Sequence, residues 1–204
     1  MSEGKFIVIE GLDGCGKSTQ ARLLGAYLLS LGRDCSVQCE PTKGETGVFL
    51  RRVLSGEVPA SPQVQAALFV ADRIAHNDEI SVLLSEGKDV ICDRYYYSSL
   101  AYQGVVSDPD WVFHINVDCP EIRRPDLCVF LDLDDEACLR RMEAGRAYRE
   151  IYENENTLLA VRRRYFEAFE RLKDRDRIVL VNADRTPGEV AEDVFAAVRA
   201  VLEE

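Results

Sequence analysis

The sequence predicts an α/β fold, a three-layer α/β/α sandwich built around a parallel sheet. Short segments are almost continuously apolar, as is typical of strands that are buried on both faces. These segments alternate with longer stretches in which apolar residues recur at helical spacing, and this alternation favours a parallel sheet covered by helices. The chain has 204 residues and shows neither an internal repeat nor a linker rich in Gly, Ser or Pro. We therefore expect a single domain over residues 1–204.

The first strand and the first helix flank a glycine-rich stretch. Lys5–Glu10 is a short apolar run that ends directly before glycine, which predicts a strand. Lys17–Leu31 carries apolar residues at helical spacing and is followed by Gly32, which predicts a helix and its end. The chain therefore begins with a strand, a loop and a helix.

The remaining elements continue this alternation. Further strands are predicted around Cys35–Glu40 and at Val90–Asp93, Leu127–Leu133 and Ile178–Val181. Further helices are predicted around Thr46–Leu54 and at Ser61–Ser85, Asp135–Ala144, Thr157–Lys173 and Pro187–Leu202. One highly polar segment, residues 143–156, interrupts two helical patterns. It is either a solvated connector or a small mobile lid.

The charge balance excludes one class of partner. Asp and Glu number 36 against 25 Lys and Arg, a net charge of −11. The resulting negative field opposes the binding of a polyanion through a broad basic patch, so a nucleic-acid polymer is not an expected partner. A small anionic ligand in a local pocket remains compatible with this charge.

Nothing in the sequence predicts export or a membrane span. The longest uncharged stretch, Val58–Ala71, contains two prolines and is shorter than the ~18 apolar residues that a membrane helix needs. The seven cysteines form no C-x-x-C pair, and most lie in apolar stretches where a reduced thiol is a small hydrophobe. We expect a soluble cytoplasmic protein without disulfides and without a membrane partner.

Gly11–Ser18 reads GLDGCGKS and matches the phosphate-binding pattern G-x-x-x-x-G-K-[ST] between a strand and a helix. Glycines let the backbone N–H groups turn into the loop, and the helix N-terminus adds positive potential. Lys17 would bridge the β- and γ-phosphates, and Ser18 offers a hydroxyl to Mg²⁺. An ordinary glycine-rich turn would not explain Lys17, Ser18 and Thr19 in sequence. The nucleotide-binding residues of this P-loop are Gly11, Leu12, Asp13, Gly14, Cys15, Gly16, Lys17, Ser18 and Thr19.

Asp93 and Arg94 follow an apolar run at the carboxyl end of a predicted strand, where α/β sheets bind ligands. Asp93 could hold Mg²⁺ through water, or it could instead cap the following helix. Arg94 would face the same crevice, and a guanidinium suits two-point contact with a phosphate.

A P-loop is shared by switches, motors and kinases, so it does not define the function by itself. The guanine signature N-K-x-D of GTP-binding switches is absent from the sequence. Motors and helicases are usually longer and carry additional elements. A small phosphotransferase of the P-loop NTPase type is the remaining interpretation.

Five segments occur in one order along the chain: FIVIEGLDGCGKSTQ, LFVADR, DRYYYSSLAYQG, RPDLCVFLDL and REIYEN. Together they resemble the thymidylate kinase family, from Phe6 to about Phe169, and NAD at Asn182–Asp184 continues the resemblance. The resemblance implies transfer of the γ-phosphoryl group of ATP to dTMP, with Mg²⁺, giving dTDP and ADP. It also implies a homodimer.

The resemblance assigns residues to the acceptor nucleotide. Phe69 would stack on thymine, and Arg73, one helical turn later, would lie near the base and the acceptor phosphate. Arg94 would clamp that phosphate. The alternatives are a core phenylalanine for Phe69 and a solvated surface arginine for Arg73.

Further acceptor residues follow from the same comparison. Ser98, Tyr102 and Gln103 would line the pocket, where a bulky ring can crowd the 2′ position and disfavour a ribonucleotide. Asp13 would lie near the acceptor sugar and the reacting phosphates. The alternatives are that Tyr102 is a core tyrosine and that Gln103 is a surface glutamine. The segment from Glu40 to Gly47 corresponds to a loop that contacts the acceptor phosphate.

The catalytic arginine is not fixed by the resemblance. Some family members carry it in the P-loop, at the position of Gly14, and others supply basic residues from the lid. This chain should therefore use Arg146 or Arg149, although Ile151 stands where some members have arginine. Arg140 matches an arginine that can pack on adenine. At the loop that corresponds to the acceptor-phosphate contact, Lys43, Arg51 and Arg52 are candidates that the sequence does not rank.

Two other functions stay open at this point. The first is a related kinase with another acceptor, such as dUMP or UMP. The second is a nucleotide-dependent regulator without catalytic activity, against which the intact set of Lys17, Ser18, Asp93 and Arg94 argues.

Overall fold

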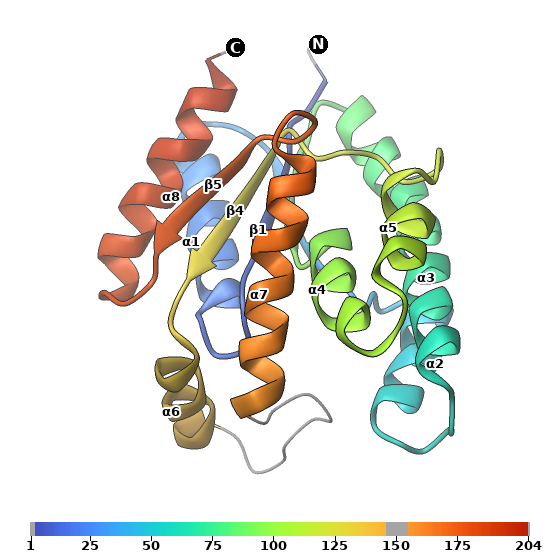
Figure 1. The fold of residues 1–204 in the computed structure, drawn as a ribbon. Coiled ribbons are helices and arrows are strands. Elements are labelled where there is room, and N and C mark those ends of the chain that lie inside the picture. Colours follow the sequence, from blue (N-terminus) through green and yellow to red (C-terminus); the bar gives the residue numbers. More distant parts are fainter. Residues whose placement is uncertain (1–2, 146–154, 204) are drawn as a thin grey trace.

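The computed structural model describes residues 3–145 and 155–203 and forms a three-layer α/β/α sandwich (Figure 1). The sheet has five strands in the order β2-β3-β1-β4-β5, and every neighbouring pair is parallel. The predicted fold class is therefore confirmed. The strands are β1 (Phe6–Glu10), β2 (Cys35–Cys39), β3 (Asp89–Asp93), β4 (Leu127–Asp132) and β5 (Ile178–Asn182).

Helices cover both faces of this sheet. The helices are α1 (Lys17–Ser30), α2 (Glu45–Leu54), α3 (Pro62–Ser85), α4 (Tyr96–Val106), α5 (Pro109–Val117), α6 (Asp135–Gly145), α7 (Glu155–Leu172) and α8 (Pro187–Leu202). Helices α1 and α8 pack together on one face, whereas α3, α4 and α7 lie on the other (Figure 1).

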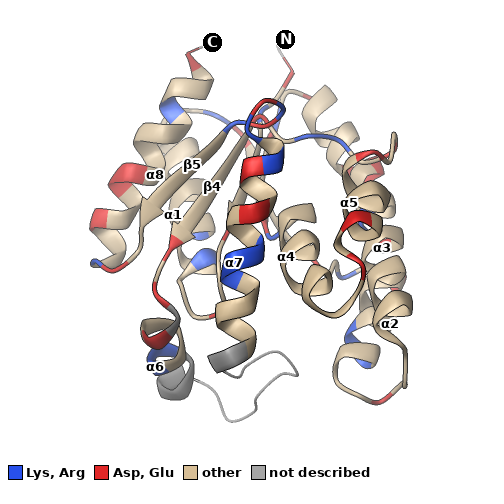
Figure 2. Ribbon diagram, in the orientation of Figure 1, with Lys and Arg blue, Asp and Glu red and all other residues tan. Residues whose placement is uncertain are grey.

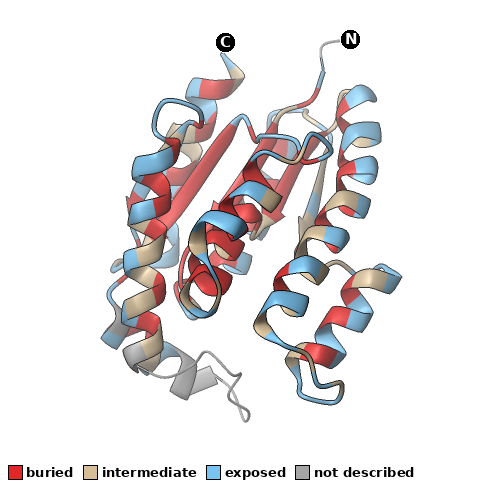
Figure 3. Cartoon of the chain, turned by 45° about the vertical axis from the view of Figure 1, so that its right-hand side comes forward, coloured by how far each residue is buried: buried red, intermediate tan, exposed pale blue. Residues whose placement is uncertain are grey.

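The core lies around the three central strands. β1 is buried along its whole length, and β3 and β4 are buried except at their last residue. The edge strands β2 and β5 are partly exposed. In Figure 3 the strands are largely red while the helices turn exposed faces outward. This burial on both faces explains why the central strands read as continuous apolar runs.

Each predicted helix and strand is present, with ends that coincide with the prediction or differ from it by at most two residues. The sequence analysis assigns no element to α4 or α5. Helix α4 is buried around most of its circumference, including polar residues such as Ser99 and Gln103, so it lacks the polar stripe that marks an amphipathic helix. α5 is short and offers few turns in which a period could be recognised.

The carboxyl ends of the parallel strands meet at one edge of the sheet. The loops that follow β1, β2 and β3 therefore gather there, while both termini lie at the opposite end of the molecule (Figure 1). Of the expected lid, residues 143–145 end α6 and residues 155–156 begin α7. Arg146, Arg149 and Ile151 lie outside the described residues.

The surface chemistry agrees with the acidic composition. Figure 2 shows Asp and Glu on α5, α6, α7 and α8, with Lys and Arg interspersed among them on α6 and α7. Within residues 3–145 and 155–203, no helix is both long and apolar enough to span a bilayer. All seven cysteines are free thiols.

Candidate active site

The loop between β1 and α1 has the backbone of a phosphate cradle. Gly11 and Gly16 have φ values of +146° and +103°, a region that side chains with a Cβ rarely adopt. A Cβ on Gly11 would also lie 2.6 Å from the Sγ atom of Cys15. Because α1 begins directly after this loop, its N-terminal N–H groups and dipole face the same space. The sequence prediction of a P-loop is consistent with this geometry.

Lys17 is the buried cation of the loop. Its side chain is 7% exposed, and Nζ donates a hydrogen bond to the carbonyl oxygen of Leu12 at 2.8 Å. This contact holds the ammonium over the loop, where an anionic phosphate oxygen would be a stronger acceptor than the carbonyl. A cavity of about 360 Å³ opens beside it, lined by Asp13, Gly14, Gly16, Lys17, Ser18, Thr19, Cys39, Glu40, Asp93 and Arg94.

Ser18 and Asp93 are brought together at this cavity. The Ser18 hydroxyl donates to the Oδ2 atom of Asp93 at 2.5 Å. Two oxygen donors side by side suit Mg²⁺, which takes few protein ligands and keeps several waters or phosphate oxygens. In the described part of the chain, no cluster of three or more His, Cys, Asp or Glu side chains could hold a metal. The Ser18–Asp93 pair offers two oxygen ligands to a cation whose other ligands would be water or phosphate oxygens.

The alternative role of Asp93 as a helix cap is not what the structure shows. The N-cap residue of α4 is Tyr95, and no hydrogen bond from its side chain caps the helix. Asp93 instead ends β3 and faces Ser18 across the mouth of the cavity.

Asp13, Arg94 and Tyr102 form a cluster beside the P-loop. Arg94 Nη2 donates to Asp13 Oδ1 at 2.6 Å, and the Tyr102 hydroxyl donates to Asp13 Oδ2 at 3.0 Å. The guanidinium carbon of Arg94 lies 5.1 Å from the centre of the Tyr102 ring. Asp13 is distant in sequence from Arg94 and Tyr102, yet these three residues, all assigned to the acceptor, share one contact network.

Electrostatics keep the Asp13 carboxylate ionised. Burial raises its pKa, but the positive charges of Arg94 and Lys17 outweigh burial and hold the pKa well below its usual range. Burial also raises the pKa of the Tyr102 phenol well above its usual value, so that group stays a neutral donor. Both members of the Arg94–Asp13 pair are therefore charged at neutral pH.

Arg94 carries a strained backbone, since its φ of +73° lies in the left-handed region. Its N–H group donates to the carbonyl of Ile9 at 3.0 Å, and its Nη1 atom donates to the Ser98 hydroxyl at 2.9 Å. Non-glycine residues keep such a conformation where the surroundings fix it. Ser98, also predicted for the acceptor pocket, therefore orients the Arg94 side chain.

Glu10 is a buried carboxylate that the sequence analysis did not single out. It is fully buried at the end of β1, where Oε1 accepts from the N–H groups of Tyr95 (2.7 Å) and Ser98 (3.1 Å). Oε2 accepts from the hydroxyls of Ser98 and Tyr165, both at 2.8 Å. The available signal was an acidic residue that ends an apolar strand directly before the P-loop.

Arg73 is held inside the protein rather than solvated. It is 1% exposed, and its guanidinium donates to Glu40 (Nη2 to Oε2, 2.7 Å), Ser99 (3.3 Å) and Asn116. The alternative of a solvated surface arginine is therefore wrong. Its positive charge is compensated by Glu40 and its orientation is fixed.

The other predicted acceptor residues lie on the helices around this cluster. Phe69 is half-buried on α3, one turn before Arg73. Gln103 is only 2% exposed on α4, so its alternative as a surface residue is wrong. Tyr102 is largely buried, yet its hydroxyl faces Asp13, so it is more than a core side chain.

Arg140 is not brought to the P-loop cavity. It lies exposed on α6, forms an ion pair with Glu136 at 3.5 Å, and is not among the residues that line that cavity. Its predicted contact with adenine stays a prediction.

The loop between β2 and α2 is anchored by a second buried carboxylate. Asp72 is 1% exposed and accepts from the Thr42 N–H at 2.7 Å, the Thr42 hydroxyl at 2.6 Å and the Thr46 hydroxyl at 2.8 Å. Arg51 donates to the carbonyls of Pro41 and Thr42. Of the unranked basic residues, Arg51 thus braces this loop, whereas Arg52 pairs with Glu57.

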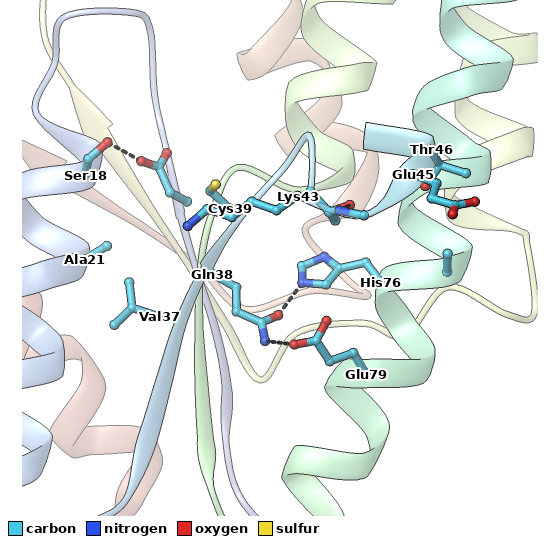
Figure 4. Close-up of a pocket in the computed structure, with 14 residues that line it drawn as sticks. Ser18, Ala21, Val37, Gln38, Cys39, Lys43, Glu45, Thr46, His76 and Glu79 are labelled. Carbon is cyan, nitrogen blue, oxygen red and sulfur yellow. Dashed lines mark hydrogen bonds between the residues drawn. The ribbon is translucent and has the colours of Figure 1, made fainter. Parts of the chain in front are cut away.

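A larger cavity of about 650 Å³ adjoins the first one on the outer side of β2 (Figure 4). The two cavities share Ser18, Cys39 and Asp93. Lys43 lines the larger cavity, and a hydrogen-bonded chain of His76, Gln38 and Glu79 crosses its wall. The Ser18–Asp93 pair therefore lies at the junction of the two cavities.

The sequence resembles that of one protein family over most of its length. A sequence model described as Thymidylate kinase matches residues 9–194. A probable thymidylate kinase of Methanococcus aeolicus is 40% identical over 195 residues, 94% of this chain and 94% of that protein. One of Pyrococcus horikoshii is 37% identical over 206 residues, 98% of each chain.

A solved structure shows the same architecture. The thymidylate kinase of Candida albicans, whose published description refers to a broad substrate specificity, superposes with a TM-score of 0.82 at 27% identity. The similarity covers 98% of this chain and 93% of that one.

Proposed function

Because the chain belongs to the thymidylate kinase family, it is a kinase that phosphorylates dTMP to dTDP, and we propose that the P-loop, Asp13 and Arg94 carry out this transfer. One observation supports the assignment most directly. Arg94, a group suited to an acceptor phosphate, lines the same cavity as Lys17, a group suited to a donor phosphate. A site that holds two phosphates face to face fits phosphoryl transfer better than nucleotide-dependent switching.

The donor half of the site would bind ATP. The N–H groups of the P-loop and the Lys17 ammonium would hold the β- and γ-phosphates. Ser18 and Asp93 would hold Mg²⁺, which neutralises phosphate charge when it is bound. The chain's contribution to the transition state is thus positive charge fixed in place before the reaction.

In the acceptor half, the dTMP phosphate would replace the Asp13 carboxylate as a partner of Arg94. The dTMP phosphate would compete with Asp13 for the Arg94 guanidinium, which stays aimed at the cavity by Ser98. An oxygen of that phosphate forms a bond to the γ-phosphorus while the bond to the β,γ-bridging oxygen breaks, which leaves dTDP and ADP. The attacking oxygen is already anionic, so no general base is required.

The remaining assignments concern acceptor choice and the catalytic arginine. We propose that Phe69 stacks on the thymine ring, that Arg73 and Gln103 lie near the base, and that the Tyr102 ring restricts the 2′ position. Arg146 or Arg149 would supply a further positive charge at the γ-phosphate. Arg140 would pack on adenine.

We further propose that the enzyme is a homodimer. Val64, Ala71, Ala75 and Val82 are exposed on α3 at spacings that keep them on one side of the helix, and Phe49 is exposed on the adjoining α2. An apolar stripe of this kind favours pairing with a second copy. Light scattering should give twice the chain mass, and Phe49→Glu should shift it toward one chain.

We propose that the enzyme is located in the cytoplasm. Its seven free thiols suit a reducing compartment, and ATP and nucleoside monophosphates are its small-molecule partners.

A coupled ADP-release assay tests the function. MgATP is offered with dTMP, dUMP, UMP, dCMP, AMP or GMP in turn, and dTMP should give the highest kcat/KM. Lys17→Ala should lower kcat with dTMP by about 10³-fold or more, because it removes the charge at the transferred phosphoryl group. Lys88→Ala is the matched control, because this lysine is half-buried, pairs with Glu86 and lies beyond the other end of the sheet.

Two results would redirect the assignment. A higher kcat/KM with dUMP or UMP would keep the chemistry and replace the acceptor. Tight ATP binding without turnover of any acceptor would favour a regulator.

A further inference from the structure

Helix α4 lacks a cap of its own, and Glu10 provides one from a different element. Tyr95 occupies the N-cap position without a side-chain cap, yet the N–H groups of Tyr95 and Ser98 both donate to Glu10 Oε1. A carboxylate is the favoured partner for the unpaired N–H groups at the positive end of a helix. The end of β1 therefore fixes the start of α4.

Arg94 lies between β3 and this cap. Arg94 has a left-handed backbone, with φ of +73°, and the N–H group of the next residue, Tyr95, donates to Glu10. Its side chain reaches Glu10 as well, because Arg94 donates to the Ser98 hydroxyl (2.9 Å) and that hydroxyl donates to Glu10 (2.8 Å). Glu10 therefore acts on both the backbone and the guanidinium of Arg94.

The same carboxylate also contacts the helix on the other side of α4. Tyr165 of α7 donates to Glu10 Oε2 at 2.8 Å and lies 2.9 Å from the Ser98 hydroxyl. Four donors thus converge on one fully buried carboxylate, and the two N–H groups among them can only donate. Burial raises the pKa of Glu10, whereas the charge of Arg94 and these hydrogen bonds favour its ionised form. An amide at this position would lack the negative charge that faces the helix N-terminus and Arg94, and its NH₂ group would require both hydroxyls to accept instead of donate.

We propose that Glu10 is a positioning residue for the acceptor phosphate: it holds Arg94 in the orientation that receives the dTMP phosphate. The inference rests on the proposed function, since that function assigns the acceptor phosphate to Arg94. Glu10 is fully buried, so we expect it to touch neither substrate. Its effect is expected mainly on the acceptor, because the side chain of Glu10 accepts from Tyr95, Ser98 and Tyr165, whereas Lys17 is held by the Leu12 carbonyl.

The test compares two buried carboxylates. Glu10→Gln should raise the KM for dTMP by about tenfold or more and leave the KM for ATP within about twofold. Asp89→Asn is the matched control, because Asp89 is also fully buried in the sheet but binds Arg33 and the Lys5 N–H at the opposite edge. It should lower the melting temperature without changing either KM beyond about twofold.

A second variant keeps the test decisive if Glu10→Gln folds poorly. Tyr165→Phe removes one of the four donors and keeps the ring, so it should raise the KM for dTMP by about threefold with ATP unaffected. The double variant Glu10→Gln with Arg94→Lys should have a dTMP KM close to that of Arg94→Lys alone, because Glu10 acts through Arg94.

Three outcomes would overturn the proposal. The first is a dTMP KM in Glu10→Gln and Tyr165→Phe that matches the wild type and Asp89→Asn. The second is a double variant whose dTMP KM exceeds that of Arg94→Lys by the same factor by which Glu10→Gln raises the wild-type KM. The third is a wild-type enzyme without dTMP turnover, which would remove the proposed function as well and is thereby distinguished from the first two.

Discussion

Asp13 illustrates how a single side chain in this site serves two partners. It accepts from Arg94, in the connection between β3 and α4, and from Tyr102 of α4. Because its pKa is held well below the usual range, it does not titrate between pH 5 and 9 and keeps both donors oriented across that interval. The Tyr102 ring is therefore fixed at two points, its hydroxyl on Asp13 and its face under Arg94.

This fixed ring leads to a prediction on sugar selectivity. Tyr102→Ala should raise kcat/KM for UMP relative to dUMP by about tenfold, because the ring no longer crowds the 2′ position. The two acceptors differ only in the 2′-hydroxyl, so their ratio isolates that contact. Coupled ADP release with each acceptor is the measurement.

Tyr102→Phe is the control for this prediction. It keeps the ring and loses the hydrogen bond to Asp13, so the UMP to dUMP ratio should stay within about twofold of the wild type. A ratio that changes equally in both variants would show that the hydroxyl, and not the bulk of the ring, sets sugar selectivity.

At the residue scale, the sequence predicts sites made of consecutive residues and misses contacts between residues that are far apart along the chain. The P-loop could be read because its ligand chemistry lies within consecutive residues. Glu10 could not, since its partners Ser98 and Tyr165 are brought to it only by the sheet and helix packing. Arg73 could be named, but its buried pairing with Glu40 follows from the fold.

At the scale of elements, the loop between β2 and α2 depends on close packing. Asp72 binds both Thr42 and Thr46, which folds the loop back on α3. A Cβ added to Gly47 would lie 2.1 Å from the Thr42 carbonyl oxygen, far inside contact distance. The backbone of α2 can approach the loop this closely only with glycine at that position.

Gly47→Ala should therefore displace the loop. We expect the free energy of unfolding to fall by about 2 kcal/mol, and the melting temperature by roughly 4–8 °C. Since the loop is expected to face the acceptor phosphate, the KM for dTMP should rise while that for ATP stays unchanged. Thermal unfolding and steady-state kinetics measure these two effects.

Gly188→Ala on α8 separates close packing from the general effect of replacing glycine. Gly188 is exposed, and a Cβ there meets nothing within 4 Å. Its stability should be unchanged or higher by up to about 1 kcal/mol, because alanine is the better helix former. Equal losses in both variants would contradict the role given to the Gly47 contact.

The strands and the long amphipathic helices were predictable because each carries its own periodicity. Helix α4 was not, although it holds Ser98, Tyr102 and Gln103. Packing against α3, α5 and α7 removes its exposed face, so its burial reflects its neighbours rather than its own pattern.

At the scale of the whole molecule, the core contains many acids that are buried in their neutral form. Burial raises the pKa of the thiols of Cys15, Cys92 and Cys128, and raises that of Cys138 to about 12. The phenols share this property: the pKa is raised for Tyr95, Tyr96, Tyr97, Tyr102 and Tyr165. These groups sit around the sheet and keep their protons while the chain is folded.

The protein should consequently lose stability in alkaline solution. An acid whose pKa is raised by folding stabilises the fold fully below its unfolded pKa, and this contribution is lost as pH rises toward the folded value. Unfolded thiols titrate near 8.5–9, so at about pH 9.5 each of the four buried cysteines costs about 1 kcal/mol and together they cost roughly 4 kcal/mol. Urea unfolding under reducing conditions at about pH 7.5 and 9.5 measures the difference, and the midpoint should fall clearly.

Cys138→Ala tests whether the buried thiols cause this loss. Because the variant lacks one group with a raised pKa, its stability should fall by about 1 kcal/mol less than that of the wild type over the same pH interval, whatever its stability at neutral pH. Equal losses in the two proteins would assign alkaline unfolding to other groups, and an unchanged wild-type midpoint would show that the unfolded chain keeps these thiols protonated.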